Sequence, residues 1–477
     1  MSELPPPETV PSPTVPDRLR DWDHDHLWHP LTVHAALWAD TGPLMLVEGH
    51  GATVIDASGQ SYLDATGGLW CVNVGYGRQE LVEAAADQMA RLPFFPLTQS
   101  HPPAIRLARR LAELLPGTPR VFFTNSGSEA NEVAFKVIRQ YWRRRGQPER
   151  FKILGRDRAY HGSTLATLAA GGQAARRQDY GPLPSGFGQV VAPYCHRCPF
   201  QLTYPACDLR CADDFDRRIQ QEGPETVAAV IVEPITAGGG VLVPPDDYLA
   251  RVDAICRSHR VKLIVDEVVT GFGRVGAWFG HQERGAVVSP DVVTMAKGLA
   301  SGYQPIGAAA FADELFHTIE GTFPGTVPAN DAGDHFRHVN TYGGHPVAAA
   351  VALANLDVLS REGLPTQSRV RGARLLDGLT QALAGHPQVR DIRGRGLLVG
   401  IELGTTPGDH NEAAALTRRV VSELRTRGVL VGRTTDVGPD GDNIVILAPP
   451  LVIAEDEVDR LVDAVAATVG VAGSATI

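Results

Sequence analysis

A lysine and an acidic residue occupy positions from which their side chains could act on one reactive group. Lys297 lies in Ala296-Lys297-Gly298, downstream of an apolar, β-branched run that ends at Asp266. Such a run predicts a buried strand that delivers Asp266 to its carboxyl end. Ligands bind at that edge of open α/β sheets, and the intervening segment is long enough for a crossover and another strand. We therefore expect the amine and the carboxylate to meet at one sheet edge.

This pair of side chains suits pyridoxal 5'-phosphate (PLP). A lysine amine forms a Schiff base with the aldehyde, and a carboxylate keeps the pyridine nitrogen protonated, so that the ring withdraws electrons. The pair also has an ordinary interpretation, because most lysines are solvated and an Asp at a strand end often only forms a turn.

A turn rich in serine and glycine offers a place for a phosphate. The turn consists of Ser126, Gly127 and Ser128. It follows a predicted strand, Val121–Thr124, and a helical pattern of apolar residues begins near Glu129. A helix start preceded by small residues presents free backbone N–H groups, hydroxyls and the positive end of the helix dipole. The same residues also fit an ordinary serine N-cap.

An aromatic residue beside a histidine is a further candidate. Tyr160 and His161 precede Gly162. Such residues can simply pack a loop, but in a PLP site the ring of Tyr160 can stack on the pyridine face.

Together these segments resemble the class III aminotransferases of PLP fold type I, which include ω-amino acid and amine:pyruvate aminotransferases. In character the chain is most similar to the taurine:pyruvate members, and the resemblance extends from about Trp28 to the 450s. It rests on motifs at Gly67–Gly77, Ser126–Asn131, Tyr160–Gly162, Glu233–Pro234, Asp266–Val268, Gly271–Arg274, Ala296–Gly298 and Thr341–Pro346.

The resemblance assigns roles to the cofactor-binding residues. It implies that Lys297 carries the cofactor and moves the substrate proton, and that Asp266 pairs with the pyridine nitrogen. It implies that the ring lies between Val268 and Tyr160. The remaining cofactor residues that it implies are Ser126, Gly127, Ser128 and His161, together with Thr341, which reaches the phosphate of a neighbouring subunit. The expected assembly is therefore a homodimer, or a dimer of dimers, with shared active sites.

Substrate-binding residues follow from the same resemblance. Glu233 ends the apolar run Val227–Val232, where it is either a structural acid or, as in the family, a group near the cofactor hydroxyl that engages a substrate arginine. Aromatic pocket residues are expected at Trp70 and at Phe94 or Phe95, although buried aromatics usually belong to a core. Gly238 leaves room for a bulkier donor or keeps the backbone near the cofactor.

The acceptor's carboxylate requires a cation, and the family places a mobile arginine before a strand that ends in Pro-Pro. In this chain Gly432 appears at the usual position and Arg433 follows one residue later. In a regular strand Arg433 faces the other way, whereas a bulge would restore its orientation. Either Arg433 holds the carboxylate in a shifted register or another group does.

The pattern of the whole chain predicts an α/β fold. Strands alternate with helices in the middle of the chain, which predicts a mostly parallel sheet sandwiched by helices, and a smaller α+β domain follows. We expect a disordered tail (1–20), an N-terminal segment that packs with the small domain (21–75), a large PLP-binding domain (76–343) and a small C-terminal domain (344–477).

Composition restricts the partners. The 477 residues carry a formal net charge of −10, which argues against nucleic acid. No apolar run approaches the ~20 residues that span a bilayer, and the proline-rich start lacks the apolar region of a signal peptide. We expect a cytoplasmic protein with small-molecule partners. Cys71 and Cys256 are expected to be buried thiols.

Four cysteines form a separate cluster, composed of Cys195, Cys198, Cys207 and Cys211. Their spacing suits either zinc or four thiols that pack a loop, and we assign no metal ligand.

The leading hypothesis is PLP-dependent, ping-pong transfer of an amino group from taurine, β-alanine or a similar amine to pyruvate. A racemase, aminomutase or decarboxylase on the same fold is the second hypothesis. An inactive metal-binding scaffold is the third, and the joint presence of the lysine, the aspartate and the phosphate turn argues against it.

Overall fold

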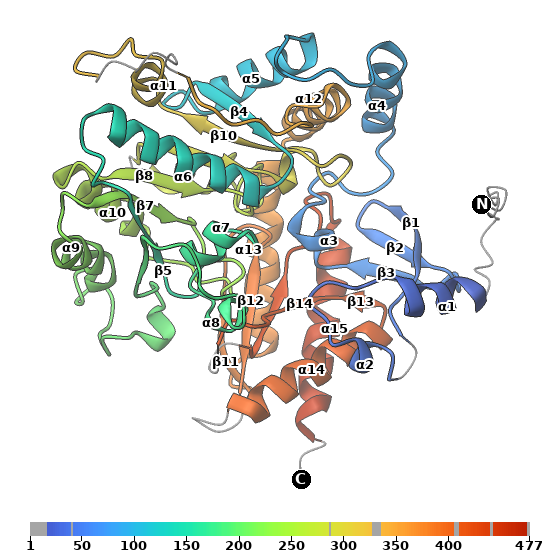
Figure 1. Ribbon diagram of the computed structural model, residues 1–477. Coiled ribbons are helices and arrows are strands. Elements are labelled where there is room, and N and C mark those ends of the chain that lie inside the picture. The colour runs from blue at the N-terminus through green and yellow to red at the C-terminus, as the bar shows by residue number, and fades with distance from the viewer. Residues whose placement is uncertain are drawn as a thin grey trace.

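The computed structural model describes residues 17–39, 42–285, 288–326, 335–404, 410–438 and 442–474. Its central feature is a seven-stranded sheet in the order β4-β10-β9-β8-β7-β5-β6, with helices on both faces (Figure 1). The strands are β4 (Arg120–Thr124), β10 (Gly307–Phe311), β9 (Val292–Met295), β8 (Lys262–Asp266), β7 (Val227–Val232), β5 (Lys152–Arg156) and β6 (Phe187–Val190). This arrangement confirms the predicted fold class.

The direction of the strands explains where a site can form. The strands β9, β8, β7, β5 and β6 are mutually parallel, and β10 is antiparallel to both of its neighbours. The parallel strands therefore end at one common edge, where Asp266 is the last residue of β8 and Glu233 follows β7. Open α/β sheets bind their ligands at this edge.

Alternation along the strands sorts side chains between two cores. Ala229 and Ile231 of β7 pack with helix α6 (Gly127–Arg144), whereas Val230 and Val232 pack with α9 (Arg210–Glu222) and α10 (Tyr248–Ser258). On β8, Ile264 belongs to the α6 side. Because side chains alternate with a period of two, Asp266 faces α6 as well.

The C-terminal part forms a second sheet in the order β11-β12-β15-β14. Its strands are β11 (Val389–Gly394), β12 (Val399–Leu403), β15 (Ile444–Leu447) and β14 (Gly432–Arg433), and its helices are α13 (Leu364–Ala382), α14 (His410–Thr426) and α15 (Glu455–Ser474). The N-terminal strands are β1 (Leu46–His50), β2 (Thr53–Asp56) and β3 (Ser61–Asp64), and β13 (Val429–Leu430) pairs with β3. This pairing joins the N-terminal segment to the C-terminal part of the chain.

Two segments differ from the expected domain limits. Helix α1 (Asp17–His26) begins inside the expected tail, so residues 17–20 are helical, and residues 1–16 lie outside the described part. Helix α12 (Pro346–Arg361), assigned to the small domain, packs against α4 (Gln79–Arg91) and α5 (Pro102–Leu114). Helix α12 therefore lies with these two helices, at the top of Figure 1.

Short elements complete the chain. They are α2 (His34–Leu37), α3 (Gly67–Trp70), α7 (Leu165–Ala170), α8 (Ala174–Arg177), α11 (Asp313–Ile319) and the 3₁₀ turns η1 (Cys195–Arg197), η2 (Gly280–Gly285) and η3 (Lys297–Leu299). None of the helices in the described part is long and apolar enough to cross a bilayer.

Candidate active site

Asp266 is held in one orientation at the end of β8. Its Oδ2 atom lies 2.8 Å from Nδ2 of Asn131 and 2.8 Å from Nδ1 of His161, and its Oδ1 atom accepts from the backbone N–H of Val268 at 3.0 Å. The residue is only 3% exposed. Because three groups fix the carboxylate, it presents one defined edge to whatever lies beside it.

Asn131 is a site residue that the sequence did not reveal. It lies on the buried face of α6, where its Nδ2 atom also donates to the backbone oxygen of His161 and its Oδ1 atom accepts from Thr294. A fully buried amide on an otherwise apolar helix face must have partners. That isolated polar residue was the available signal.

Lys297 follows β9 and begins η3 with a φ of +42°, a conformation that is strained for a residue other than glycine. Its Nζ atom lies 4.8 Å from the centre of the Trp70 ring and has no hydrogen-bond partner among the described residues. Burial lowers the pKa of Lys297, although nearby Cys71, Asp266 and Glu233 oppose that shift. A lowered pKa increases the fraction of neutral, nucleophilic amine.

Glu233 follows β7 by one residue and lies near the amine of Lys297. It accepts from the backbone N–H of Tyr160 at Oε1 and from that of Ala237 at Oε2, both at 3.2 Å. Burial raises the pKa of Glu233 to about 7, with Asp266 adding to the rise while His161 and Arg156 oppose it. The carboxyl group can therefore carry a proton near neutral pH, which is typical of functional sites.

The serine-glycine turn adjoins these residues. The Ser126 hydroxyl caps α6 by accepting from the N–H of Glu129 at 3.2 Å, and the Ser128 hydroxyl accepts from the N–H of Ser163 at 3.1 Å. A Cβ atom on Gly127 would lie 2.9 Å from the methyl groups of Val268. Glycine is therefore required at this point, where the start of α6 meets the chain just beyond Asp266.

These groups fit a cofactor that has an aldehyde, a ring nitrogen and a phosphate. An amine without a hydrogen-bond partner suits the aldehyde, and a fixed buried carboxylate suits a protonated ring nitrogen. The capped start of an 18-residue helix suits the phosphate. PLP, which the sequence predicts, combines these three features.

Two of the expected substrate residues, Trp70 and Gly238, lie together with Tyr160 next to Lys297. A Cβ atom on Gly238 would lie 3.4 Å from Cβ of Tyr160 and 3.9 Å from the Trp70 ring, so these side chains surround one point. Gln173 is a further neighbour, because the same Cβ would lie 3.3 Å from its Nε2 atom. The sequence did not identify Gln173, which is 4% exposed and whose Oε1 atom has no hydrogen-bond partner among the described residues.

The other expected residues lie apart from this group. Phe94 stacks on His345 with a separation of 5.6 Å between ring centres, and Phe95 is 47% exposed. Thr341 is also exposed. Within a single chain, these three residues belong to the surface around the 341–345 segment.

Arg433 lies in a strand without a bulge. In the pairing of β14 with β15, Gly432 is opposite Ile446 and Arg433 is opposite Val445. A Cβ atom on Gly432 would lie 3.9 Å from the Thr66 methyl group, whereas Arg433 interacts electrostatically with Arg418, Asp442 and Asp436. The shifted register that its predicted role requires is therefore not present, and the role of Arg433 stays a prediction.

The cysteines differ in part from expectation. Cys256 is buried as predicted, but Cys71 is only half-buried and lies close enough to Lys297 to influence its pKa. The prediction for Cys71 was wrong because α3 ends next to the site rather than in a core.

Three of the four clustered cysteines lie close together. Burial raises the pKa of Cys211 to about 12, and the nearby thiols of Cys195 and Cys207 add to this rise. Among the described residues, no group of three or more metal-binding side chains is arranged to hold an ion.

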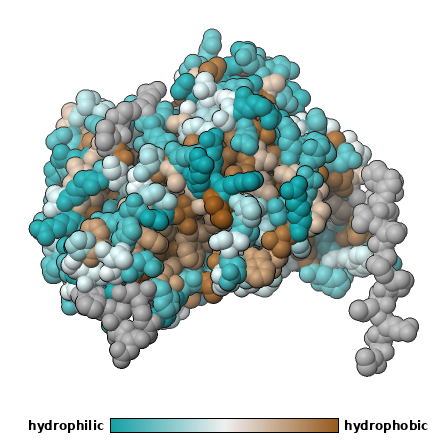
Figure 2. Space-filling model, turned by 90° about the horizontal axis from the view of Figure 1, so that it is seen from above, coloured by the Kyte–Doolittle hydropathy of each residue, from teal (hydrophilic) through white to brown (hydrophobic). Residues whose placement is uncertain are grey.

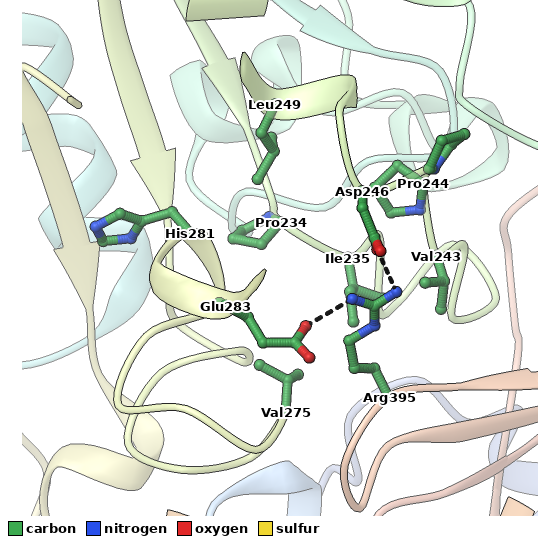
Figure 3. A pocket seen from close by; sticks show the side chains of 12 residues that line it. Pro234, Ile235, Val243, Pro244, Asp246, Leu249, Val275, His281, Glu283 and Arg395 are labelled. Carbon is green, nitrogen blue, oxygen red and sulfur yellow. Dashed lines mark hydrogen bonds and ion pairs between the residues drawn. The ribbon is translucent and has the colours of Figure 1, made fainter. Parts of the chain in front are cut away.

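A pocket that begins one residue after Glu233 shows how the C-terminal sheet is attached to the rest of the chain (Figure 3). Arg395, between β11 and β12, makes ion pairs of 2.8 Å with Glu283 and with Asp246. Pro234 and Ile235, which follow Glu233, line the same pocket. Arg395 thus fixes the C-terminal sheet against the segment that leads from Glu233.

Comparisons with known proteins agree with this geometry. Residues 35–469 match the family model described as aminotransferase class-III. An uncharacterized aminotransferase of Bacillus subtilis, YhxA, is 46% identical over 94% of this chain and 95% of its own. A taurine–pyruvate aminotransferase of Rhodobacter capsulatus is 40% identical over 93% and 95%. The PLP-bound crystal structure of an amine transaminase from an uncultivated Pseudomonas species is 36% identical, covers 94% of this chain and 99% of its own, and has a TM-score of 0.86.

Proposed function

The chain belongs to the class III aminotransferases, and we propose that it transfers an amino group from an ω-amino acid or a similar primary amine, such as taurine or β-alanine, to pyruvate. Its cofactor is PLP. The observation that carries the proposal is the meeting of Lys297, Asp266 and Glu233 at one edge of the sheet, where the Lys297 amine has a lowered pKa and Asp266 is fixed by Asn131.

Bound PLP supplies an aldehyde and an electron-withdrawing ring, which makes the amine-bearing carbon of a substrate acidic. Asp266 holds the proton of the ring nitrogen, and Asn131 and His161 keep its carboxylate in place. The Ser126–Ser128 turn and the start of α6 bind the phosphate. Val268 and Tyr160 would contact the two faces of the ring.

Lys297 is the group that moves the substrate proton. Its amine takes the proton from the amine-bearing carbon of the donor and returns a proton to the corresponding carbon of the acceptor. The lowered pKa favours the neutral amine that this step needs. Donor and acceptor use the same position in turn, so the proposed mechanism is ping-pong.

An amino-donor screen with pyruvate as acceptor tests this function. Taurine, β-alanine and simple primary amines are supplied to the holoenzyme, and alanine and the oxidised donor are both measured. We expect the two products in equal amounts, and we expect oxidised donor from a single turnover without pyruvate. Racemised or decarboxylated substrate without alanine would instead establish the second hypothesis, and a protein that binds zinc but not PLP would establish the third.

We also propose that the active unit is a homodimer or a dimer of dimers. Gly343 and Gly344 pack against Phe123, at the end of the strand that leads into the phosphate turn. Next to them, Thr341 is exposed and Tyr342 is 60% exposed. This segment is therefore close to the phosphate turn of its own chain while its side chains face outward, as sharing a site with a partner requires.

Exposed apolar side chains support the same assembly. On and between α4 and α5 they are Val82, Met89, Phe95, Leu97 and Ile105. Figure 2, which views the molecule from the side of these helices, shows apolar side chains gathered in a hollow near the centre of that face. Apolar patches of this kind mark protein interfaces.

A further inference from the structure

We propose that Arg176 binds the distal acid group of an ω-amino acid donor, an inference that rests on the proposed function and specifies its substrate class. Arg176 lies on α8 with its guanidinium carbon 5.3 Å from the centre of the Tyr160 ring. Its Nη2 atom donates to the backbone oxygen and the hydroxyl of Thr435, both at 3.3 Å. Thr435 follows β14, so Arg176 reaches the loop between β14 and β15.

The guanidinium of Arg176 faces a cavity and retains binding capacity. Tyr160, Ser163 and Arg176 line a cavity of about 520 Å³ beside the site. The carboxylates of Asp179 and Asp436 line it as well, but neither forms an ion pair with Arg176. The Nε atom of Arg176 is buried and has no hydrogen-bond partner among the described residues. A buried donor of this kind is costly unless a ligand satisfies it.

The position of Arg176 favours the donor's acid group over that of pyruvate. Lys297 adjoins Trp70, and Gly238 lies between Trp70 and Tyr160, so the path from the reacting amine to Arg176 passes Trp70, Gly238 and Tyr160. The carboxylate of pyruvate is bonded directly to the reacting carbon and requires a cation next to Lys297. In an ω-amino acid at least one further carbon separates the acid group from the reacting carbon, which suits a cation set back beyond Tyr160.

The chemistry of the side chain fits either acid. A guanidinium binds two oxygens of a carboxylate or of a sulfonate through parallel N–H groups. Gln173 lies along the same path, where its Oε1 atom can accept from a donor's amine or from a water molecule. Arg176 would thus select donors of the β-alanine and taurine type over amines without an acid group.

Kinetics of Arg176→Ala test the inference, with Arg177→Ala as the matched control. Arg177 is the next residue on α8, and its side chain binds Gln189 instead of facing the cavity. For Arg176→Ala we expect the KM for β-alanine to rise about 10- to 100-fold, the loss typical of a charge-assisted pair. The KM for pyruvate should change by less than about twofold. Arg176→Lys should give an intermediate KM for β-alanine, because lysine keeps the positive charge but lacks the parallel N–H donors of the guanidinium.

A second readout does not depend on turnover. Propionate, which has the acid group but no amine, should bind the holoenzyme in calorimetry, and Arg176→Ala should weaken that binding by the same factor. A rise in the pyruvate KM alone, or unchanged constants for β-alanine and propionate, would overturn the inference. If the wild type forms no alanine from any donor, the proposed function fails, whereas propionate binding still tests Arg176.

Discussion

Asn131 donates a hydrogen bond from its Nδ2 atom to Oδ2 of Asp266 over 2.8 Å. Asn131 lies about one helical turn beyond Gly127, the first residue of α6. The helix proposed to receive the phosphate at its N-terminus therefore also positions, through Asn131, the carboxylate proposed for the ring nitrogen. One rigid helix would thus set the distance between these two parts of the site.

Asp266→Asn is expected to retain PLP while losing most of its activity. An amide cannot hold the ring-nitrogen proton by charge, so the negative charge that develops on the substrate carbon is less stabilised. We expect the donor half-reaction to slow by about 10²- to 10³-fold, measured by stopped-flow absorbance. Asp313→Asn, which alters an exposed acid paired with Arg120, is the control and should leave the rate unchanged. A normal half-reaction rate in Asp266→Asn would refute the assigned role.

Lys297 is expected to carry the cofactor. Borohydride reduction of the holoenzyme followed by peptide mapping should place the pyridoxyl group on Lys297. Lys297→Ala should lower kcat by at least about 10²- to 10⁴-fold, the range typical of general acid–base catalysis, and an added small amine should restore part of the rate. An adduct on any other lysine would remove the basis of the site assignment.

Glu233 is expected to make stability depend on pH near neutrality. Its pKa is raised to about 7 in the folded protein, from its ordinary value of 4.5. Between these values the folded state binds more protons than the unfolded state, so the contribution of Glu233 to stability falls as the pH rises. In the cofactor-free protein, the Tm difference between Glu233→Gln and wild type should increase from pH 5 to 7 and then level off. A difference that does not vary with pH would contradict the raised pKa.

Arg433→Ala tests whether this residue binds the acceptor. If Arg433 reaches the carboxylate of pyruvate, the KM for pyruvate should rise by about one to two orders of magnitude. Arg427→Ala, which removes an exposed arginine paired with Glu423, is the matched control. An unchanged pyruvate KM would agree with the regular pairing of β14 and would show that another group holds the carboxylate.

The active species is expected to be a dimer or a larger assembly. Sedimentation of the active enzyme should show no monomer, and dilution should lower specific activity as subunits separate. Thr341→Ala should weaken PLP binding, because the proposed hydrogen bond crosses to the partner's phosphate. A fully active monomer would exclude shared sites.

The sequence was sufficient for the residues whose environment is local. The apolar run Val227–Val232 coincides with strand β7, and Asp266 was placed at a strand end, because β-branched runs and their end points are local signals. Strand β10 was not predicted from the sequence. β10 consists of glycine, alanines and one phenylalanine, which have little intrinsic strand preference, and it forms because β4 and β9 enclose it.

Only the tertiary structure identified Asn131, Gln173, Cys71 and Arg176 as neighbours of the site. Asn131 lies on α6, Cys71 follows α3, and Gln173 and Arg176 belong to the start of α8 and to α8 itself. None stands at a spacing that predicts its contact. The register of β14 was likewise undecided until its pairing with β15 placed Gly432 toward Thr66 and Arg433 toward Arg418. Periodicity along a chain determines which face of an element is buried. Which side chains meet across elements depends on the packing of the whole sheet, and so does the pKa of a buried group such as Glu233.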